Sequence, residues 1–373
     1  MKIVADADLF QISTLFGHLG NLELVPGREI ESRHLTDADA LIVRSITDVS
    51  EELLQGSSIQ FVGSATSGLD HIDSEYLSEN GIHLADAKGS NANAVVDYCF
   101  AALDQLGYLD QARLNGLRVG IVGYGAIGSL LANKLATLGA SIKVNDPPLE
   151  QDKSQAYNFG FSSLEEIANC DVVSLHTPLS KSGEFPTENL IKLGFLDQLP
   201  QQALLLNSCR GGVVDERAVL ALMEDRPDLQ FVFDVWDNEP QVSEELVARV
   251  DIATPHIAGY SLESKLKAVS CLRDDFVSFF ELEKTANKNE TEVEEKKPIK
   301  VTNISEVLEQ SFSIAELSDE FKEAASNKRV FEFFDQARKE LLKRRELKSL
   351  ALRGQCDDDF EIAVLEQLGV TVN

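Results

Sequence analysis

Residues 119–147 read VGIVGYGAIGSLLANKLATLGASIKVNDP, and this stretch decides the fold that the sequence predicts. A short apolar run leads into a G-x-G-x-x-G pattern at Gly123, Gly125 and Gly128, and the Leu- and Ala-rich stretch that follows predicts a helix. A second apolar run ends at Asp146, about 20 residues beyond the glycines. Strand, glycine turn, helix, strand and acid in this order are typical of a dinucleotide-binding βαβ unit.

The residue types of this unit match what a dinucleotide requires. The first glycine permits a tight turn, the second lets the backbone approach a pyrophosphate, and the third lets the helix pack on the strand. The N–H groups of Ala126 and Ile127 are then available to bind an anion at the helix N-terminus. A carboxylate at Asp146 can accept hydrogen bonds from both ribose hydroxyls and would repel a 2′-phosphate, which favours NAD over NADP.

Length, composition and charge exclude several classes of function. The 373 residues suffice for two or three domains, and 43% hydrophobic with 26% charged residues is typical of a soluble globular protein. A formal net charge of −28 argues against nucleic acid or an anionic membrane as a partner. We see no apolar run of ~18 residues and no signal-peptide pattern. Five cysteines without a C-x-x-C pair indicate reduced thiols and no metal site, so we expect a cytoplasmic protein.

Alternating apolar runs and helical stretches predict two parallel-sheet α/β domains and a smaller third unit. We expect a flavodoxin-like substrate domain at 1–95 plus 260–284 and a doubly wound, Rossmann-type NAD domain at 96–259. The stretch 285–298 is almost purely polar and predicts a linker. Residues 299–373 predict a small α+β unit, with strands at 300–304 and 347–352 and helices at 327–346 and 361–369.

Three polar residues each follow a predicted strand of the NAD domain: Arg210, Glu239 and His256. The carboxyl ends of strands line the ligand crevice of open α/β sheets. There a guanidinium can hold a carboxylate, an imidazole can take a hydroxyl proton as hydride leaves, and an acid can orient that imidazole. Each residue alone has a simpler structural interpretation, but their order on such a sheet predicts hydride transfer from a 2-hydroxy acid.

Several motifs resemble the D-isomer-specific 2-hydroxyacid dehydrogenases: the glycine-rich unit, NSCRGGVVDE at 207–216, FDVWDNEP at 233–240 and TPHIAGYS at 254–261. Further likeness lies in VRSIT at 43–47, SATSGLDHID at 64–73 and FDQARKELLKRRELKSL at 334–350. It points to the branch of that family that oxidises 4-phospho-D-erythronate to 3-hydroxy-2-oxo-4-phosphobutanoate in pyridoxal 5′-phosphate synthesis. In that branch the C-terminal unit is a dimerisation domain, so the resemblance implies a homodimer through 299–373.

The resemblance also implies a role for each matching residue. His256 would transfer the proton, with Arg210 and Glu239 completing the catalytic set, and a phosphorylated 2-hydroxy acid would be the substrate. The implied NAD-binding residues are Gly123, Gly125, Ala126, Ile127, Gly128, Asp146, Thr177, Ser208, Cys209, Asp234 and Gly259, and the implied substrate-binding residues are Ser45, Thr66 and Tyr260.

Other interpretations stay open at this point. The chain could be another enzyme of the family, such as one acting on 3-phosphoglycerate, with a regulatory C-terminal unit, or a module that binds NAD without catalysis. The charge of Arg44 makes it a candidate ligand for the substrate phosphate. An equally good interpretation is that its side chain only contributes to packing within its domain. His71 and His176 are interpreted as structural, and Cys209 lacks the His partner that a thiolate nucleophile requires.

Overall fold

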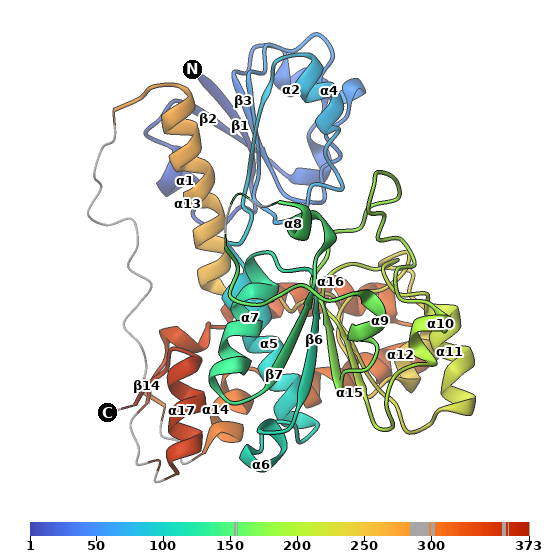
Figure 1. Cartoon of the computed structure of the whole chain (residues 1–373). Helices are drawn as coiled ribbons and strands as arrows, with labels where there is room; N and C mark the ends of the chain where they lie inside the picture. The colour runs from blue at the N-terminus through green and yellow to red at the C-terminus, as the bar shows by residue number, and fades with distance from the viewer. Residues whose placement is uncertain are drawn as a thin grey trace. The chain divides into compact units, whose positions relative to one another are not determined.

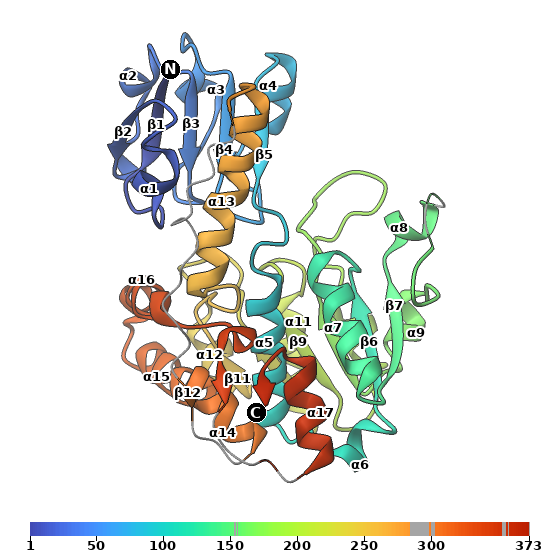
Figure 2. The same cartoon turned by 90° about the vertical axis from the view of Figure 1, so that its left-hand side faces the viewer.

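The computed structural model describes residues 1–152, 154, 156–283, 298–299, 303–352, 356 and 358–372. These residues form two compact units (Figures 1 and 2). The first contains Met1–Asn91 and the helix that begins at Leu262, and the second contains Ala92–Ser261 and the described residues from Pro298 onward. The expected linker at 285–298 lies outside the described residues except for Pro298, and the three expected domain bounds stay a prediction.

The first unit is built on a five-stranded parallel sheet in the order β2-β1-β3-β4-β5, the flavodoxin-type order. The central strand β3 is buried at all four positions, as expected for a strand covered on both faces. Phe276 of α13 packs edge-on against Phe16 and Phe61, with ring centroids 5.4 and 5.3 Å apart. The elements are β1 (Lys2–Asp6), α1 (Ile12–Phe16), β2 (Asn21–Val25), α2 (Ser32–Leu35), β3 (Ala40–Val43), α3 (Glu51–Leu54), β4 (Phe61–Ser64), α4 (Ser74–Glu79), β5 (His83–Asp86) and α13 (Leu262–Phe279).

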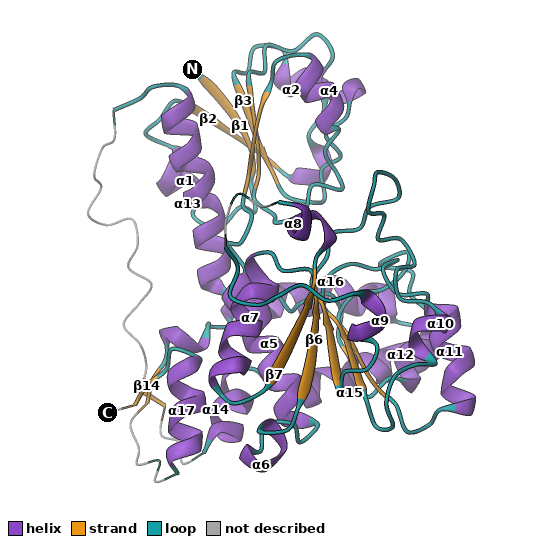
Figure 3. Ribbon diagram, viewed as in Figure 1, coloured by secondary structure: helices purple, strands orange, loops and turns teal. Residues whose placement is uncertain are grey.

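The second unit is built on a six-stranded parallel sheet in the order β11-β10-β9-β8-β6-β7. Figure 3 shows β6 and β7 of this sheet with helices around them. A single parallel bridge joins Val144 of β7 to Phe161 on the outer edge of the sheet. This bridge stands where a doubly wound dinucleotide fold has its third strand, so the sheet follows the Rossmann order. The strands are β6 (Arg118–Val122), β7 (Ser141–Asn145), β8 (Val172–Leu175), β9 (Leu204–Asn207), β10 (Gln230–Phe233) and β11 (Ile252–Ala253).

Helices lie on both sides of this sheet, and α5 is the most deeply buried of them. Residues Ala94 to Leu103 of α5 are all buried, which explains why nearly all of them are apolar; Asp97 is the one acid among them. The helices are α5 (Ala92–Gln105), α6 (Gln111–Leu114), α7 (Ala126–Thr137), α8 (Pro147–Gln151), α9 (Leu164–Ile167), α10 (Leu193–Leu196), α11 (Glu216–Asp225) and α12 (Glu244–Arg249).

The C-terminal part of the second unit differs most from the expectation. Residue Ile304, the last residue of the strand expected at 300–304, begins helix α14 because the Asn303 side chain caps it; residues 300–302 are outside the described set. The helix expected at 327–346 ends at Glu340, and Leu347–Ser349 form a 3₁₀ turn before a two-residue strand. The elements are β12 (Pro298–Ile299), α14 (Ile304–Ser311), α15 (Ile314–Ser326), α16 (Val330–Glu340), β13 (Ala351–Leu352), α17 (Asp359–Gln367) and β14 (Thr371–Val372).

Helix α15 joins this C-terminal part to the six-stranded sheet. The Phe321 ring packs edge-on against Trp236 at 5.8 Å, and the Ser318 hydroxyl accepts a hydrogen bond from the N–H of Ala253 in β11 at 3.0 Å. Strand β11 is the edge of the sheet, so α15 covers an otherwise open strand edge. Among the described residues, no helix is both long enough and apolar enough to cross a membrane.

Candidate active site

Three neighbouring strands bring the predicted catalytic residues to one edge of the second sheet. Arg210 follows β9, Glu239 follows β10 and His256 follows β11, and these strands are adjacent in the sheet. Because parallel strands end at the same edge, residues distant in sequence converge at their carboxyl ends.

Glu239 and His256 form a direct pair. The Nδ1 atom of His256 lies 2.6 Å from Glu239 Oε2, and the N–H of Trp236 donates to Glu239 Oε1 at 2.8 Å. Burial favours the neutral acid, but the charge and hydrogen bond of His256 and the Trp236 N–H outweigh it and hold the pKa of Glu239 below its usual value. With Nδ1 hydrogen-bonded to the carboxylate, Nε2 is the ring nitrogen left to exchange a proton with a substrate.

A buried aspartate fixes the loop that carries His256. The Asp234 carboxylate accepts hydrogen bonds from the N–H groups of Ile257 and Ala258 at 2.7 and 2.9 Å and from the Thr254 hydroxyl at 2.7 Å. His256 itself has a left-handed backbone with φ 55°. Such a conformation costs about 1–2 kcal/mol in a residue with a side chain, and the bonds to Asp234 hold the loop in it.

The loop of Arg210 packs against the turn that holds Glu239. A Cβ atom at Gly211 would lie 1.9 Å from the Trp236 carbonyl oxygen, so only glycine fits there. The Asn207 side chain donates to the Arg210 carbonyl at 3.3 Å, and Arg210 Nη1 donates to the Cys209 carbonyl at 2.7 Å. The backbone around Arg210 is therefore fixed on both sides.

The glycine-rich turn has the shape of a phosphate cradle. Gly123 has φ 91°, and a Cβ there would lie 2.6 Å from the His176 carbonyl oxygen. A Cβ at Gly128 would lie 2.0 Å from the Gly123 carbonyl oxygen. Gly125 is different, because a Cβ built there has no atom of the described residues within 4 Å. The space beside the N-terminus of α7, where Ala126 begins the helix, is therefore open to an anion.

Residues at the ends of β7, β8 and β9 also fit NAD. Asp146 caps α8 and accepts from the N–H of Tyr124 at 2.7 Å and of Leu149 at 3.1 Å, which leaves lone pairs of its carboxylate for ribose hydroxyls. The hydroxyls of Thr177 and Ser208 are buried beside the thiols of Cys209 and Cys99, which are weak hydrogen-bonding groups. Buried hydroxyls are normally satisfied, so these two groups suit a polar ligand.

His176 and Cys209, which also lie near these strand ends, each form a hydrogen bond with a neighbouring side chain. His176 Nε2 lies 2.9 Å from Ser174 Oγ, and complete burial lowers the pKa of His176 to about 3, so its ring is neutral. Cys209 donates to Asn207 Oδ1 at 3.1 Å, and burial raises the pKa of its thiol, which keeps it protonated. Gly259 and Tyr260 continue the loop after His256.

The predicted substrate residues of the first unit follow its central strands. Ser45 is exposed after β3, and the Thr66 hydroxyl, after β4, donates to the Gly68 carbonyl at 2.8 Å. Arg44 forms a bidentate pair with buried Asp6, at 2.6 and 3.0 Å, and contacts Asp8 at 2.8 Å. These contacts support the packing interpretation of Arg44.

Sequence reasoning missed two arginines of the C-terminal part. Arg338 Nη2 lies 3.5 Å from Glu239 Oε2, and buried Arg344 donates to the carbonyls of Ala94 at 2.7 Å and Ala258 at 3.1 Å. Both side chains lie in the stretch 334–350, for which the sequence predicts part of a dimerisation domain and a solvent-exposed charged face at 343–345; the structure buries Arg344 instead. No local motif marks them, because their partners lie far away in the sequence.

Comparisons with known proteins agree with this geometry. Residues 102–258 match the sequence model of the D-isomer specific 2-hydroxyacid dehydrogenase NAD binding domain. An erythronate-4-phosphate dehydrogenase of Serratia proteamaculans (strain 568) is 39% identical over 377 residues, covering 99% of both chains. Its counterpart in Marinomonas sp. (strain MWYL1) is 45% identical over 270 residues, covering 72% of this chain and 70% of the relative.

Solved structures show the same fold. The NAD⁺-bound 3-phosphoglycerate dehydrogenase of Entamoeba histolytica has a TM-score of 0.63 at 25% identity and covers 75% of this chain and 95% of its own. A D-lactate dehydrogenase of Aquifex aeolicus, complexed with NAD and lactic acid, has a TM-score of 0.58 at 21% identity. The match covers 75% of this chain and 94% of the dehydrogenase chain. The α/β fold class and NAD as cofactor are thus confirmed. This chain belongs to the erythronate-4-phosphate dehydrogenases, a branch of the D-isomer specific 2-hydroxyacid dehydrogenase family.

Proposed function

We propose that the protein oxidises 4-phospho-D-erythronate to 3-hydroxy-2-oxo-4-phosphobutanoate with NAD, as a step in pyridoxal 5′-phosphate synthesis. The single observation that carries the chemistry is the Glu239–His256 pair, with 2.6 Å between Glu239 Oε2 and His256 Nδ1. Like Arg210, this pair lies at the carboxyl ends of the strands of the second sheet. The choice of substrate rests on the full-length likeness to the Serratia relative.

The residues divide the reaction among them. NAD, when bound, accepts the hydride from C2. His256 Nε2 takes the proton of the C2 hydroxyl, and Glu239 stabilises the resulting imidazolium through Nδ1. Arg210 holds the substrate carboxylate and polarises the C2 oxygen. The hydroxyl carbon is oxidised by loss of a hydride and a proton, and His256 returns the proton to solvent.

The test is a comparison of substrates with the purified protein. NADH formation is followed by absorbance with 4-phospho-D-erythronate, 3-phospho-D-glycerate and D-lactate. We expect kcat/KM to be highest for the first. A higher value for 3-phosphoglycerate, together with inhibition by serine, would favour the alternative enzyme, and no NADH with any of them would favour a module without catalysis.

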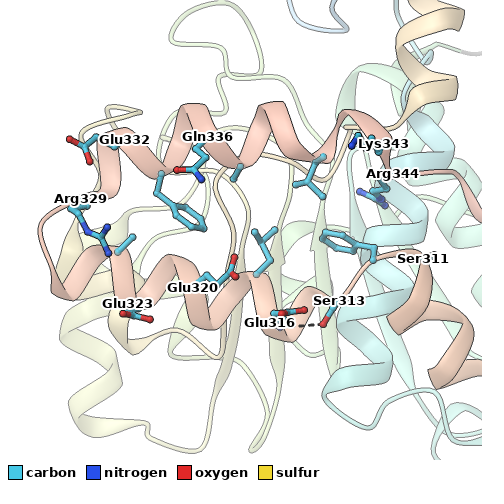
Figure 4. A pocket seen from close by; sticks show the side chains of 16 residues that line it. Ser311, Ser313, Glu316, Glu320, Glu323, Arg329, Glu332, Gln336, Lys343 and Arg344 are labelled. Atoms are coloured by element: carbon cyan, nitrogen blue, oxygen red, sulfur yellow. Dashed lines mark hydrogen bonds between the residues drawn. The ribbon is translucent and has the colours of Figure 1, made fainter.

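A homodimer through the C-terminal part is a further element of the proposal. A groove of about 690 Å³ runs between α15 and α16 (Figure 4). Glu316, Glu320 and Glu323 line it from α15, and Arg329 and Lys343 flank it at the two ends of α16. Opposite charges on one groove suit a second copy of the same surface in a two-fold arrangement.

The oligomeric state is tested by light scattering after size-exclusion chromatography. The Phe331 side chain on α16 is 56% exposed, an unusual degree for a phenylalanine. We expect a dimer for the wild type and a monomer for Phe331→Asp, because a buried charge disfavours the interface. A monomeric wild type would contradict the proposal. We also propose a cytoplasmic location, which the five free cysteines support.

A further inference from the structure

Helix α16 places one arginine against the Glu239–His256 pair. Arg338 Nη2 lies 3.5 Å from Glu239 Oε2, and Arg338 Nε donates to the Pro255 carbonyl at 3.4 Å. Pro255 immediately precedes His256, so one guanidinium contacts both the acid of the pair and the loop of the imidazole. The Arg338 side chain is half-buried, with its charge 5.1 Å above the Phe334 ring and 6.0 Å from the centre of the Tyr260 ring.

The Glu239 carboxylate is held from three separate elements. The Trp236 N–H, after β10, binds Oε1, whereas His256, after β11, and Arg338, on α16, share Oε2. The first two donors lie at the carboxyl ends of strands β10 and β11, within the stretch that matches the NAD-binding domain model. The third comes from a helix about 80 residues further along the chain, outside the NAD-binding match at 102–258.

The charges around Glu239 explain why a cation is useful there. Besides His256 and Arg338, Glu239 faces Glu216 of α11, and repulsion among Glu216, Asp237 and Glu239 adds to burial in raising the pKa of Glu216 to about 7. Burial favours a protonated Glu239, while His256, the Trp236 N–H and Arg338 favour the carboxylate and together lower the pKa of Glu239. An ionised Glu239 is the form that accepts the Nδ1–H bond and orients the ring.

We propose that Arg338 is a positioning residue for the catalytic pair: its guanidinium fixes the Glu239 carboxylate and the Pro255–His256 backbone so that Nε2 of His256 faces the substrate. The inference rests on the proposed dehydrogenase activity and deepens it. Arg338 exchanges no proton, because a guanidinium stays charged throughout the working pH range. The C-terminal part of the chain thereby contributes to catalysis as well as to assembly.

The first experiment measures kcat/KM against pH for Arg338→Gln, Arg338→Lys and the control Arg33→Gln, whose side chain is 72% exposed in the first unit. We expect Arg338→Gln to lower kcat/KM about 3- to 30-fold and to move the acidic limb of the profile to higher pH, since Glu239 becomes easier to protonate. We expect Arg338→Lys to restore part of the lost kcat/KM and part of the shift in the pH profile. Arg33→Gln should match the wild type in both measurements. NAD affinity and Tm are measured alongside, and both are expected to stay close to wild type.

A second measurement does not depend on turnover. The ring-nitrogen signals of isotope-labelled His256, assigned with His256→Asn, are titrated by NMR in wild type and Arg338→Gln. We expect the titration midpoint or the Nδ1–H signal of His256 to change in the variant while the other five histidines keep theirs. If the wild type forms no NADH but this change occurs, the proposed function fails and the positioning role stands. An unchanged pH profile with kcat/KM within twofold of wild type, and unchanged His256 signals, would overturn the role of Arg338.

Discussion

At the scale of single residues, the geometry of the site depends on how each side chain is held. His256 is fixed through its backbone by Asp234, through its ring by Glu239, and through its preceding carbonyl by Arg338. General-base catalysis requires this fixed geometry, because proton transfer needs the ring nitrogen within hydrogen-bond reach of the hydroxyl.

Replacing the imidazole tests the proposed base directly. We expect His256→Asn to lower kcat by about 10²–10⁴-fold, the usual contribution of a general base, while NAD affinity stays near wild type. Steady-state kinetics and a fluorescence titration with NADH measure the two effects. The exposed His18, replaced by Asn, is the matched control. Retention of most of the turnover in His256→Asn would remove this residue from the mechanism.

Asp97 makes stability depend on pH. Burial raises the pKa of Asp97 to about 7, above its ordinary 3.8. The folded state therefore binds the Asp97 proton more tightly than the unfolded state does. The contribution of this proton to the free energy of unfolding is complete below about pH 4 and is lost as the pH rises through about 7.

Asp97→Asn should remove this dependence, because the amide oxygen still accepts the bond that the Leu347 N–H donates at 2.9 Å. We expect the variant to have a Tm about 2–4 °C above wild type at pH 8, and a Tm close to wild type at pH 4. Thermal denaturation at both pH values measures this. Exposed Asp225, replaced by Asn, serves as the control and should shift neither value. A lower Tm of Asp97→Asn at pH 8 would show that ionised Asp97 stabilises the fold.

At the scale of elements, the C-terminal part is fastened to α5 and to the loop after β11 by one buried arginine. Arg344 donates to the carbonyls of Ala94 and Ala258, and its charge lies 4.4 Å above the Phe312 ring. Burial lowers the pKa of Arg344, while the nearby acids Asp97, Asp234 and Glu346 favour its charged form.

Removing this guanidinium leaves buried carbonyls and acids without their donor. We expect Arg344→Met to lower the free energy of unfolding by about 3–5 kcal/mol, the usual cost of breaking a buried ionic cluster. Urea denaturation followed by circular dichroism measures it. Arg33→Met is the exposed control and should change the value by about 0.5 kcal/mol or less. A loss of similar size in both variants would show that the cluster adds no special stability.

At the scale of the whole molecule, the sequence predicted the two parallel sheets well and the C-terminal part poorly. Strands such as β3 and β9 are short apolar runs bounded by turns, a signal that survives without tertiary context. Ile304 and Leu347 have polar residues on both sides, and the Asn303 cap and the hydrogen bond from the Leu347 N–H to Asp97 of α5 decide their structure. The sequence could indicate a catalytic role for Arg210, Glu239 and His256, because the carboxyl ends of strands line the ligand crevice in this fold. The place of Arg338 follows only from its contact with Glu239 in the structure.

The excess of acids predicts how salt affects stability. With a formal net charge of −28, the folded chain repels itself, and salt screens that repulsion more than it weakens the fewer ion pairs. We expect Tm to rise by a few degrees between about 0.05 and 0.3 M salt, equally for NaCl and KCl. A Tm that falls over this range would mean that local ion pairs outweigh the overall repulsion.

The close approach of Gly211 to the Trp236 carbonyl has a consequence for anyone redesigning this enzyme. The segment bearing the guanidinium and the turn bearing the acid are coupled at this point, since a side chain larger than hydrogen would push them apart. Any change of substrate preference therefore has to keep the backbone approach between the Arg210 loop and the turn of Glu239.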